Sequence, residues 1–155
     1  MRVQILAIGR LGRGPEAELI TDYQKRFDQT ARKLGLGPLD IRELEAKKSN
    51  KVEEAKLLEK ALPKGAFVIA MDERGKTLTS PEFAKNLQSW REQGRADLCF
   101  LIGGADGLSP EFRKLANYQL SLGTMVWPHA LARVMLCEQL YRAASILTGS
   151  PYHRE

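Results

Sequence analysis

The sequence predicts an α/β protein with a mostly parallel sheet and helices on both faces of that sheet. Three short segments, 3–8, 66–71 and 98–102, are apolar at nearly every position, as expected of strands that helices cover on both sides. Longer amphipathic segments alternate with them, and this β-α-β-α rhythm is typical of parallel strands joined by crossover helices. A length of 155 residues predicts a single domain spanning residues 1–155.

The first half of the chain predicts three further elements. A helix is expected over 15–34, because its apolar residues recur on one stripe and a glycine follows its last turn. A weaker strand follows over 39–44. Asn50 and Glu53 have the spacing of a capping box, so we expect a helix to begin there and to end near the proline and glycine after position 62.

The second half continues the same alternation. The charged segment 72–75 should close the second apolar strand, and Ser80, followed by a proline and a glutamate, predicts a helix with Ser80 as its cap. A short strand is expected over 119–122 and a long final helix over 130–147. In such a sheet, ligands bind beyond the carboxyl ends of the strands.

Composition limits the class of protein. The chain has a net charge of +5 and a pI near 9.3, which permits a polyanionic partner without requiring one. No apolar run approaches the roughly 20 residues of a membrane span, and the apolar amino terminus is too short for a signal peptide, so we expect a cytoplasmic protein. Cys99 and Cys137 lack CxxC spacing and only two histidines are present, which predicts buried reduced thiols and no metal site.

Two glycine clusters follow predicted strands. The first, 9–14, has the spacing GxxGxG and not GxGxxG, which disfavours a dinucleotide-binding oxidoreductase and favours a basic loop that contacts solvent or RNA. The second, 103–107, places three glycines where a ligand crevice should open, which favours close approach of the backbone to a ligand. The apolar segment 122–129 contains Gly and Pro, and it fits either an adenine slot or a crossover packed in the core.

The final helix and the tail carry polar residues that could have either a structural or a functional role. Glu138 and Arg142 are four positions apart, the spacing of an ordinary helix salt bridge. The helix is apolar on most of its sides, which predicts a subunit interface. The tail 151–154 combines an aromatic ring, an imidazole and a guanidinium, groups that stack on bases and bind phosphates, although a frayed terminus is the alternative.

Four segments together resemble one known family, namely 102–110, 128–134, 138–143 and 151–154. They are similar to the RlmH family of SPOUT-class methyltransferases, which modify a pseudouridine in bacterial large-subunit ribosomal RNA. The resemblance implies a trefoil knot near the carboxyl end, S-adenosylmethionine as cofactor and a homodimer packed through the first and last helices. It also implies 3-methylpseudouridine as the product and the assembled ribosome as the substrate.

The resemblance also implies site residues. The cofactor pocket should be lined by Met71, Gly103, Gly104, Leu122, Gly123, Thr124, Met125, Val126 and Trp127. A sulfonium methyl group is already activated, so no metal is needed, but the N3–H of pseudouridine must lose its proton. The candidate bases are His129, Glu138 and the favoured His153; Arg142 and Arg154 would contact phosphate or imidate oxygens, and Tyr152 would stack on the base. A non-catalytic ribosome-binding factor with the same fold is the alternative function.

Overall fold

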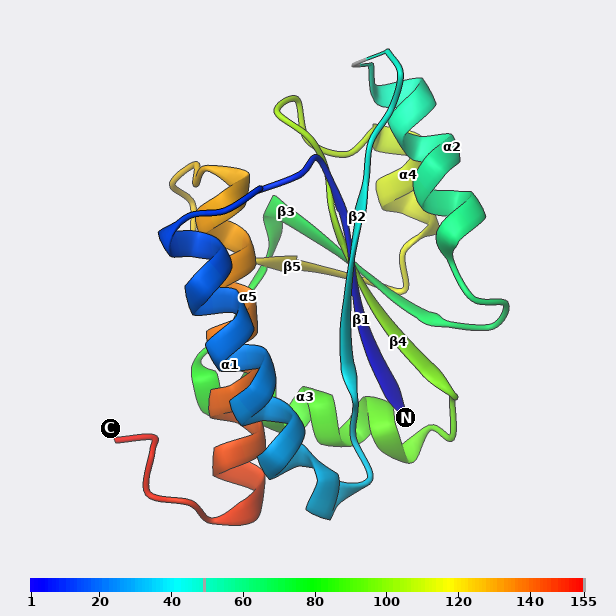
Figure 1. Cartoon of the computed structure of the whole chain (residues 1–155). Coiled ribbons are helices and arrows are strands. Elements are labelled where there is room, and N and C mark those ends of the chain that lie inside the picture. The colour runs from blue at the N-terminus through cyan, green and yellow to red at the C-terminus, as the bar shows by residue number, and fades with distance from the viewer. Residues whose placement is uncertain (49, 155) are drawn as a thin grey trace.

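Five strands form one parallel sheet in the order β2-β1-β4-β3-β5 (Figure 1). The computed structural model describes residues 1–48 and 50–154. The apolar strands occupy the middle of the sheet, as their sequences predict. In chain order the strands are β1 Arg2–Ile8, β2 Leu39–Leu44, β3 Phe67–Thr77, β4 Asp97–Ile102 and β5 Tyr118–Ser121.

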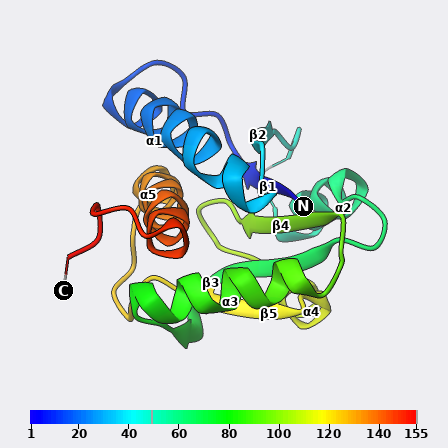
Figure 2. The same ribbon diagram turned by 90° about the horizontal axis from the view of Figure 1, so that it is seen from below.

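Helices cover both faces of the sheet, which confirms the predicted fold class (Figure 2). One face carries α1 and α3, with α5 between them; the other carries α2 and α4. A single 3₁₀ turn, η1, extends α1 up to the predicted glycine. The bounds are α1 Pro15–Ala31, η1 Arg32–Leu34, α2 Lys51–Ala61, α3 Ser80–Glu92, α4 Pro110–Leu115 and α5 His129–Thr148.

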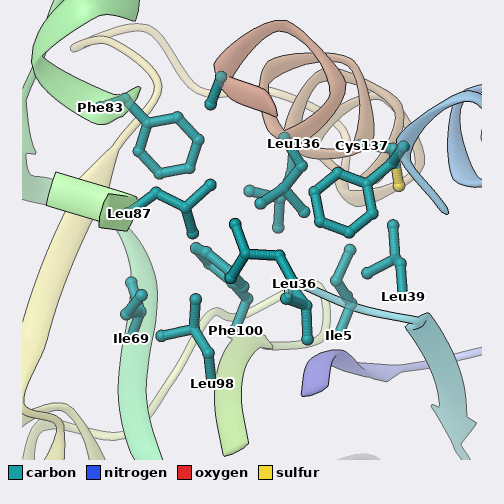
Figure 3. Close-up of a cluster of buried hydrophobic side chains, with 14 of the residues drawn as sticks. Ile5, Leu36, Leu39, Ile69, Phe83, Leu87, Leu98, Phe100, Leu136 and Cys137 are labelled. Atoms are coloured by element: carbon teal, nitrogen blue, oxygen red, sulfur yellow. The ribbon is translucent and has the colours of Figure 1, made fainter. Parts of the chain in front are cut away.

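The larger core lies between the sheet and the helices α1, α3 and α5. Figure 3 shows Ile69 and Phe100 of the sheet facing Leu87 of α3 and Leu136 of α5. Each large apolar side chain buried in this way contributes about 1.5–3 kcal/mol relative to an exposed one. Burial also raises the pKa of the Cys137 thiol to about 12, so this free cysteine is a protonated core residue, as predicted.

The segment 72–75 does not close the second apolar strand, contrary to prediction. β3 continues to Thr77, and Leu120 of β5 pairs with both Met71 and Lys76, so the four residues form an irregularity within the strand. The pairing of β3 with β4 ends at Ala70. Beyond that point one edge of β3 is free of a partner strand, and polar residues are tolerated there.

Two predicted helix caps differ in detail. Thr79, and not Ser80, caps α3, because its hydroxyl accepts from the backbone N–H of Glu82 while the Glu82 side chain accepts from the backbone N–H of Thr79. Asn50 caps α2 as predicted. The Glu53 side chain, however, forms an ion pair with Lys56 at 3.4 Å, so the expected capping box is only half formed.

A buried arginine joins the last helix to the first two strands. Arg133 of α5 is 1% exposed, and its guanidinium donates to the carbonyl oxygens of Ile8 at 2.9 Å and Gly9 at 2.8 Å. The same group forms an ion pair with the Glu43 carboxylate of β2 at 2.9 Å. These contacts hold the first turns of α5 at the carboxyl ends of β1 and β2.

Replacing Arg133 by methionine should destabilise the fold strongly. Arg133→Met keeps much of the side-chain volume but leaves two carbonyl oxygens and a carboxylate without their donor. We expect a loss of roughly 3–5 kcal/mol in the free energy of unfolding, measured by urea denaturation. Lys25→Met, at an exposed position of α1, is the control, and equal unfolding midpoints for the two variants would contradict this role.

Candidate active site

A cavity of about 290 Å³ lies at the carboxyl edge of the sheet. It is built from the extension of β3, the glycine loop after β4 and the apolar loop after β5, which is where a parallel sheet is expected to bind ligands. Its volume falls at the lower end of the range of ligand pockets. The lining residues are Met71, Asp72, Glu73, Arg74, Ile102, Gly103, Gly104, Ala105, Asp106, Gly107, Leu120, Leu122, Gly123, Met125, Val126, Trp127, His129 and Ala132.

The structure brings together eight of the nine positions that the family resemblance assigns to the cofactor. Met71, the two glycines 103 and 104, and the loop residues 122, 123 and 125–127 all line the cavity. Thr124 does not line it. Asp72 and Arg74 also line the cavity, and they were not predicted because the charged sequence 72–75 indicates a turn that leaves the sheet and not a continuation of β3.

The glycine loop is shaped by its own close packing as well as by the cavity. A Cβ atom at Gly103 would lie 2.6 Å from the backbone carbon of Gly107, which leaves no space for a side chain. The backbone N–H of Gly107 donates to the carbonyl of Gly104 at 2.9 Å and closes a tight turn. Gly103 is therefore required by its contact with the backbone of Gly107, and Gly107 adopts a left-handed backbone angle that favours glycine.

The apolar loop after β5 is open to solvent on one side. Met125 is 72% and Val126 77% exposed, and Trp127 is 41% exposed. A crossover packed in the core would bury these side chains, so that alternative is wrong. Three exposed apolar side chains in succession at the rim of a cavity are typical of a surface that binds a ligand or another protein.

One carboxylate of the cavity wall is paired with two arginines, and a second carboxylate is exposed. The side chain of Asp72 is only 6% exposed, and its Oδ1 atom accepts from the backbone N–H of Arg74 at 2.8 Å. The guanidinium groups of Arg74 and Arg113 lie 3.2 Å and 3.6 Å from the same carboxylate. Asp106, on the glycine loop, is exposed and also lines the cavity.

The first glycine cluster lies outside this cavity. Among the described residues, none of 9–14 lines it, and the backbone N–H of Leu11 donates instead to Glu43 at 2.7 Å. His129, the first residue of α5, both lines the cavity and lies close to Gly9. The loop 9–14 therefore reaches the cavity only through His129.

The tail forms a polar cluster against the last turns of α5. The hydroxyl of Tyr152 donates to Glu138 Oε1 at 2.9 Å, and Arg142 Nε donates to the same oxygen at 3.0 Å. The Arg142 guanidinium also lies over the Tyr152 ring at 4.8 Å and donates to Nδ1 of His153 at 3.3 Å. The tail residues 152 and 153 are thus docked on the helix, contrary to the frayed-terminus alternative.

The carboxylate of Glu138 organises this cluster electrostatically. Burial, followed by the hydrogen bond to Glu138, raises the pKa of the Tyr152 hydroxyl, which therefore stays protonated as a donor. The hydrogen bond to Glu138 also raises the pKa of Arg142. Because Arg142 donates to Nδ1, the neutral His153 ring carries its proton on Nε2 in this arrangement.

The structure separates the predicted catalytic residues into two groups. His129 lies at the cavity, whereas Arg142, Tyr152 and His153 meet near the other end of α5. At 1.5 Å per residue, the helix between His129 and Arg142 is about 20 Å long. Arg154 follows this second group and is exposed.

Comparison with known proteins gives the class of this fold and cavity. Residues 1–153 match the family model described as predicted SPOUT methyltransferase. A probable methylase family protein from Haemophilus influenzae Rd KW20 has a similar fold, with a TM-score of 0.54 at 13% identity over 99% of this chain and 70% of that chain. The chain therefore belongs to the SPOUT methyltransferases.

Curated relatives define the family more narrowly. A protein of Dinoroseobacter shibae and one of Ruegeria pomeroyi, both named ribosomal RNA large subunit methyltransferase H, are each 59% identical over 155 residues, covering 99% of both chains. The chain belongs to this family, as its sequence motifs predict.

Within residues 1–48 and 50–154, no cluster of three or more His, Cys, Asp or Glu side chains is arranged to hold a metal ion. No helix in these ranges is long and apolar enough to cross a membrane.

Removing the charge of Glu138 should release the tail. In Glu138→Gln the amide cannot hold Arg142 and Tyr152 as strongly, because hydrogen bonds to a charged group are about twice as strong as neutral ones. We expect faster amide hydrogen exchange in residues 150–154, with exchange in α3 unchanged. Glu92→Gln, an exposed carboxylate on α3, is the control, and unchanged exchange in the tail of Glu138→Gln would contradict the assignment.

Proposed function

We propose that this protein transfers a methyl group from S-adenosylmethionine to N3 of a pseudouridine in large-subunit ribosomal RNA. The observation that carries the proposal is the cavity, which gathers eight of the nine predicted cofactor positions from three separate loops. The names of the curated relatives support the reaction and the RNA class. The resemblance of the four motif segments supports the pseudouridine target.

The residues of the cavity fit the chemistry of S-adenosylmethionine. Apolar side chains such as Met71 and Leu122 suit the faces of an adenine ring, and the backbone of the glycine loop is open to polar contacts. The exposed carboxylate of Asp106 favours a ligand with an ammonium and a sulfonium group. When bound, this cofactor supplies an electrophilic methyl group attached to positively charged sulfur.

The chain must provide alignment and proton removal. Alignment of the target nitrogen with the methyl group contributes several kcal/mol, and a positioned base contributes about 10²–10⁴-fold in rate. We assign the base to His153. Because Nδ1 of this ring accepts from Arg142, His153 must turn away from Arg142 before Nδ1 can accept the N3 proton of the pseudouridine.

Arg142, Arg154 and Tyr152 would hold the target nucleotide. The two guanidinium groups are suited to phosphate or imidate oxygens, and the Tyr152 ring is suited to stacking on a splayed base. His129 is placed at the cavity itself, where it can contact the nucleotide beside the cofactor. These roles require the tail and the cavity to meet in one site.

A homodimer would bring the tail and the cavity together in one site. Within one chain about 20 Å of helix separates the cavity from the tail cluster, so we propose that the tail of one subunit completes the cavity of its partner. The exposed apolar side chains of Leu19 on α1 and Leu131 on α5, together with the loop 125–127, are suited to a subunit interface. The trefoil knot near the carboxyl end and a cytoplasmic location belong to the same proposal.

The reaction is tested directly on ribosomes that lack the modification. After incubation with the protein and S-adenosylmethionine, we expect mass spectrometry to detect a methyl group on N3 of one pseudouridine in the large-subunit RNA. His153→Ala should lower the rate by about 10²-fold or more, whereas Lys25→Met should not change it. Binding to ribosomes without any methyl transfer would instead favour the non-catalytic binding factor.

The shared site is tested by mixing two inactive subunits. Arg154→Ala impairs a tail, and Gly103→Val blocks a cavity through the contact with Gly107. In a heterodimer isolated by two different affinity tags, one site combines an intact tail with an intact cavity, so we expect roughly half of the wild-type rate. Each variant alone is the control, and a heterodimer as inactive as both controls would contradict a site shared between subunits.

A further inference from the structure

Glu54 of α2 is a buried carboxyl group behind the glycine loop. It is only 7% exposed. A Cβ atom at Gly104 would lie 2.8 Å from its Oε1 atom and 3.1 Å from Oε2. The backbone angles of Gly104 are not left-handed, so a side chain at this position would disturb the contact with the Glu54 carboxyl group and would not strain the backbone.

The apolar surroundings of Glu54 give no reason for a carboxyl group to be buried there. It lies among the apolar side chains of Leu58, Leu108 and Phe112, which pack between α2, α4 and the sheet. Burial, and next the negative charge of Asp106, raises its pKa, while the backbone N–H of Gly104 and the charge of Lys51 act in the opposite direction. An apolar residue would be easier to bury here.

The position of this carboxyl relative to the cavity is specific. Gly104 and Asp106 line the cavity on one side of the loop, and Glu54 contacts the loop from the other side without lining the cavity itself. The backbone N–H of Gly104 faces the carboxyl group. A contact of this kind fixes the conformation of the glycine loop through one polar group. The apolar side chains around Glu54 offer no such group to the loop backbone.

We propose that Glu54 is a positioning residue that holds the glycine loop 103–107 in the conformation that binds the cofactor. The inference rests on the proposed function, because it takes S-adenosylmethionine as the ligand of the cavity. In this proposal α2 contributes to the affinity for the cofactor, although the helix lies outside all four motif segments. Glu54 acts through Gly104 and does not contact the cofactor or the RNA.

The first test replaces the carboxylate and keeps its shape. We expect Glu54→Gln to weaken binding of S-adenosylmethionine about tenfold by isothermal titration calorimetry, because a neutral amide attracts the backbone N–H of Gly104 less strongly than a carboxylate does. The KM for the cofactor should rise by the same factor, with kcat within about twofold of wild type, because the loop is restored once the cofactor is bound. Glu59→Gln, an exposed position on the same helix, is the matched control.

The second test uses the close contact itself. Gly104→Ala should weaken cofactor binding in the wild-type background, because the new methyl group collides with the Glu54 carboxyl. In a Glu54→Ala background the space is available, so adding Gly104→Ala should have little further effect. The two substitutions are therefore expected to be strongly non-additive, and additive losses would contradict a contact between Glu54 and Gly104 that governs cofactor binding. Circular dichroism establishes that each variant is folded before titration.

The outcomes separate this inference from the proposed function. If Glu54→Gln binds the cofactor as tightly as Glu59→Gln, or if Gly104→Ala is equally damaging in both backgrounds, the positioning role is overturned while the methyltransferase assignment stands. If the wild-type protein takes up no S-adenosylmethionine, both are overturned. A tenfold weaker affinity with preserved kcat, together with non-additivity, supports the assignment.

Discussion

The guanidinium of Arg133 is the contact on which the site depends. It lies inside the protein, and its partners are the carbonyl oxygen of Ile8 at the end of β1, that of the following Gly9, and a carboxylate of β2. These partners belong to the strands farthest in sequence from α5, so the contact fixes where the final helix begins. The position of His129, and the end of the apolar loop that precedes it, follow from this placement. Apolar packing against the sheet places the body of α5, and this polar contact fixes its first turn beside the cavity.

Hydrophobic pattern was sufficient to predict the central strands, because β1 and β4 are buried on both faces and their sequences contain almost nothing but apolar residues. It failed at residues 72–75, where β3 extends beyond its pairing with β4. A strand with one free edge admits charged residues, and a local pattern does not reveal which edge a neighbour covers. The cap of α3 was misplaced by one residue because Thr79 and Ser80 are both good caps, and only the reciprocal bond with Glu82 distinguishes them.

The lining of the cavity was predictable because family motifs mark it, whereas the distance between the tail and the cavity was not. Each motif is local, and nothing in it specifies that α5 places His129 and Arg142 about 20 Å apart. Glu54 was missed for a different reason, since a glutamate on an amphipathic helix is usually solvated. One signal was available: Glu54 precedes Leu58 by four positions and so lies on the apolar stripe of α2.

Buried charge is concentrated at the border of the cavity. Arg133 lies at the start of α5, Glu54 behind the glycine loop and Asp72 in the extension of β3; Asp97, paired with Arg2 at the opposite end of the sheet, is the exception. Burying a charge costs free energy that an apolar residue of similar size would not. Each of the three groups contacts the backbone of a loop or strand at or beside the cavity. Apolar packing alone would leave the position of that backbone less well defined. The free-energy cost of these buried charges is therefore offset at the border of the cavity. There, the exact position of the backbone determines which ligand the protein can bind.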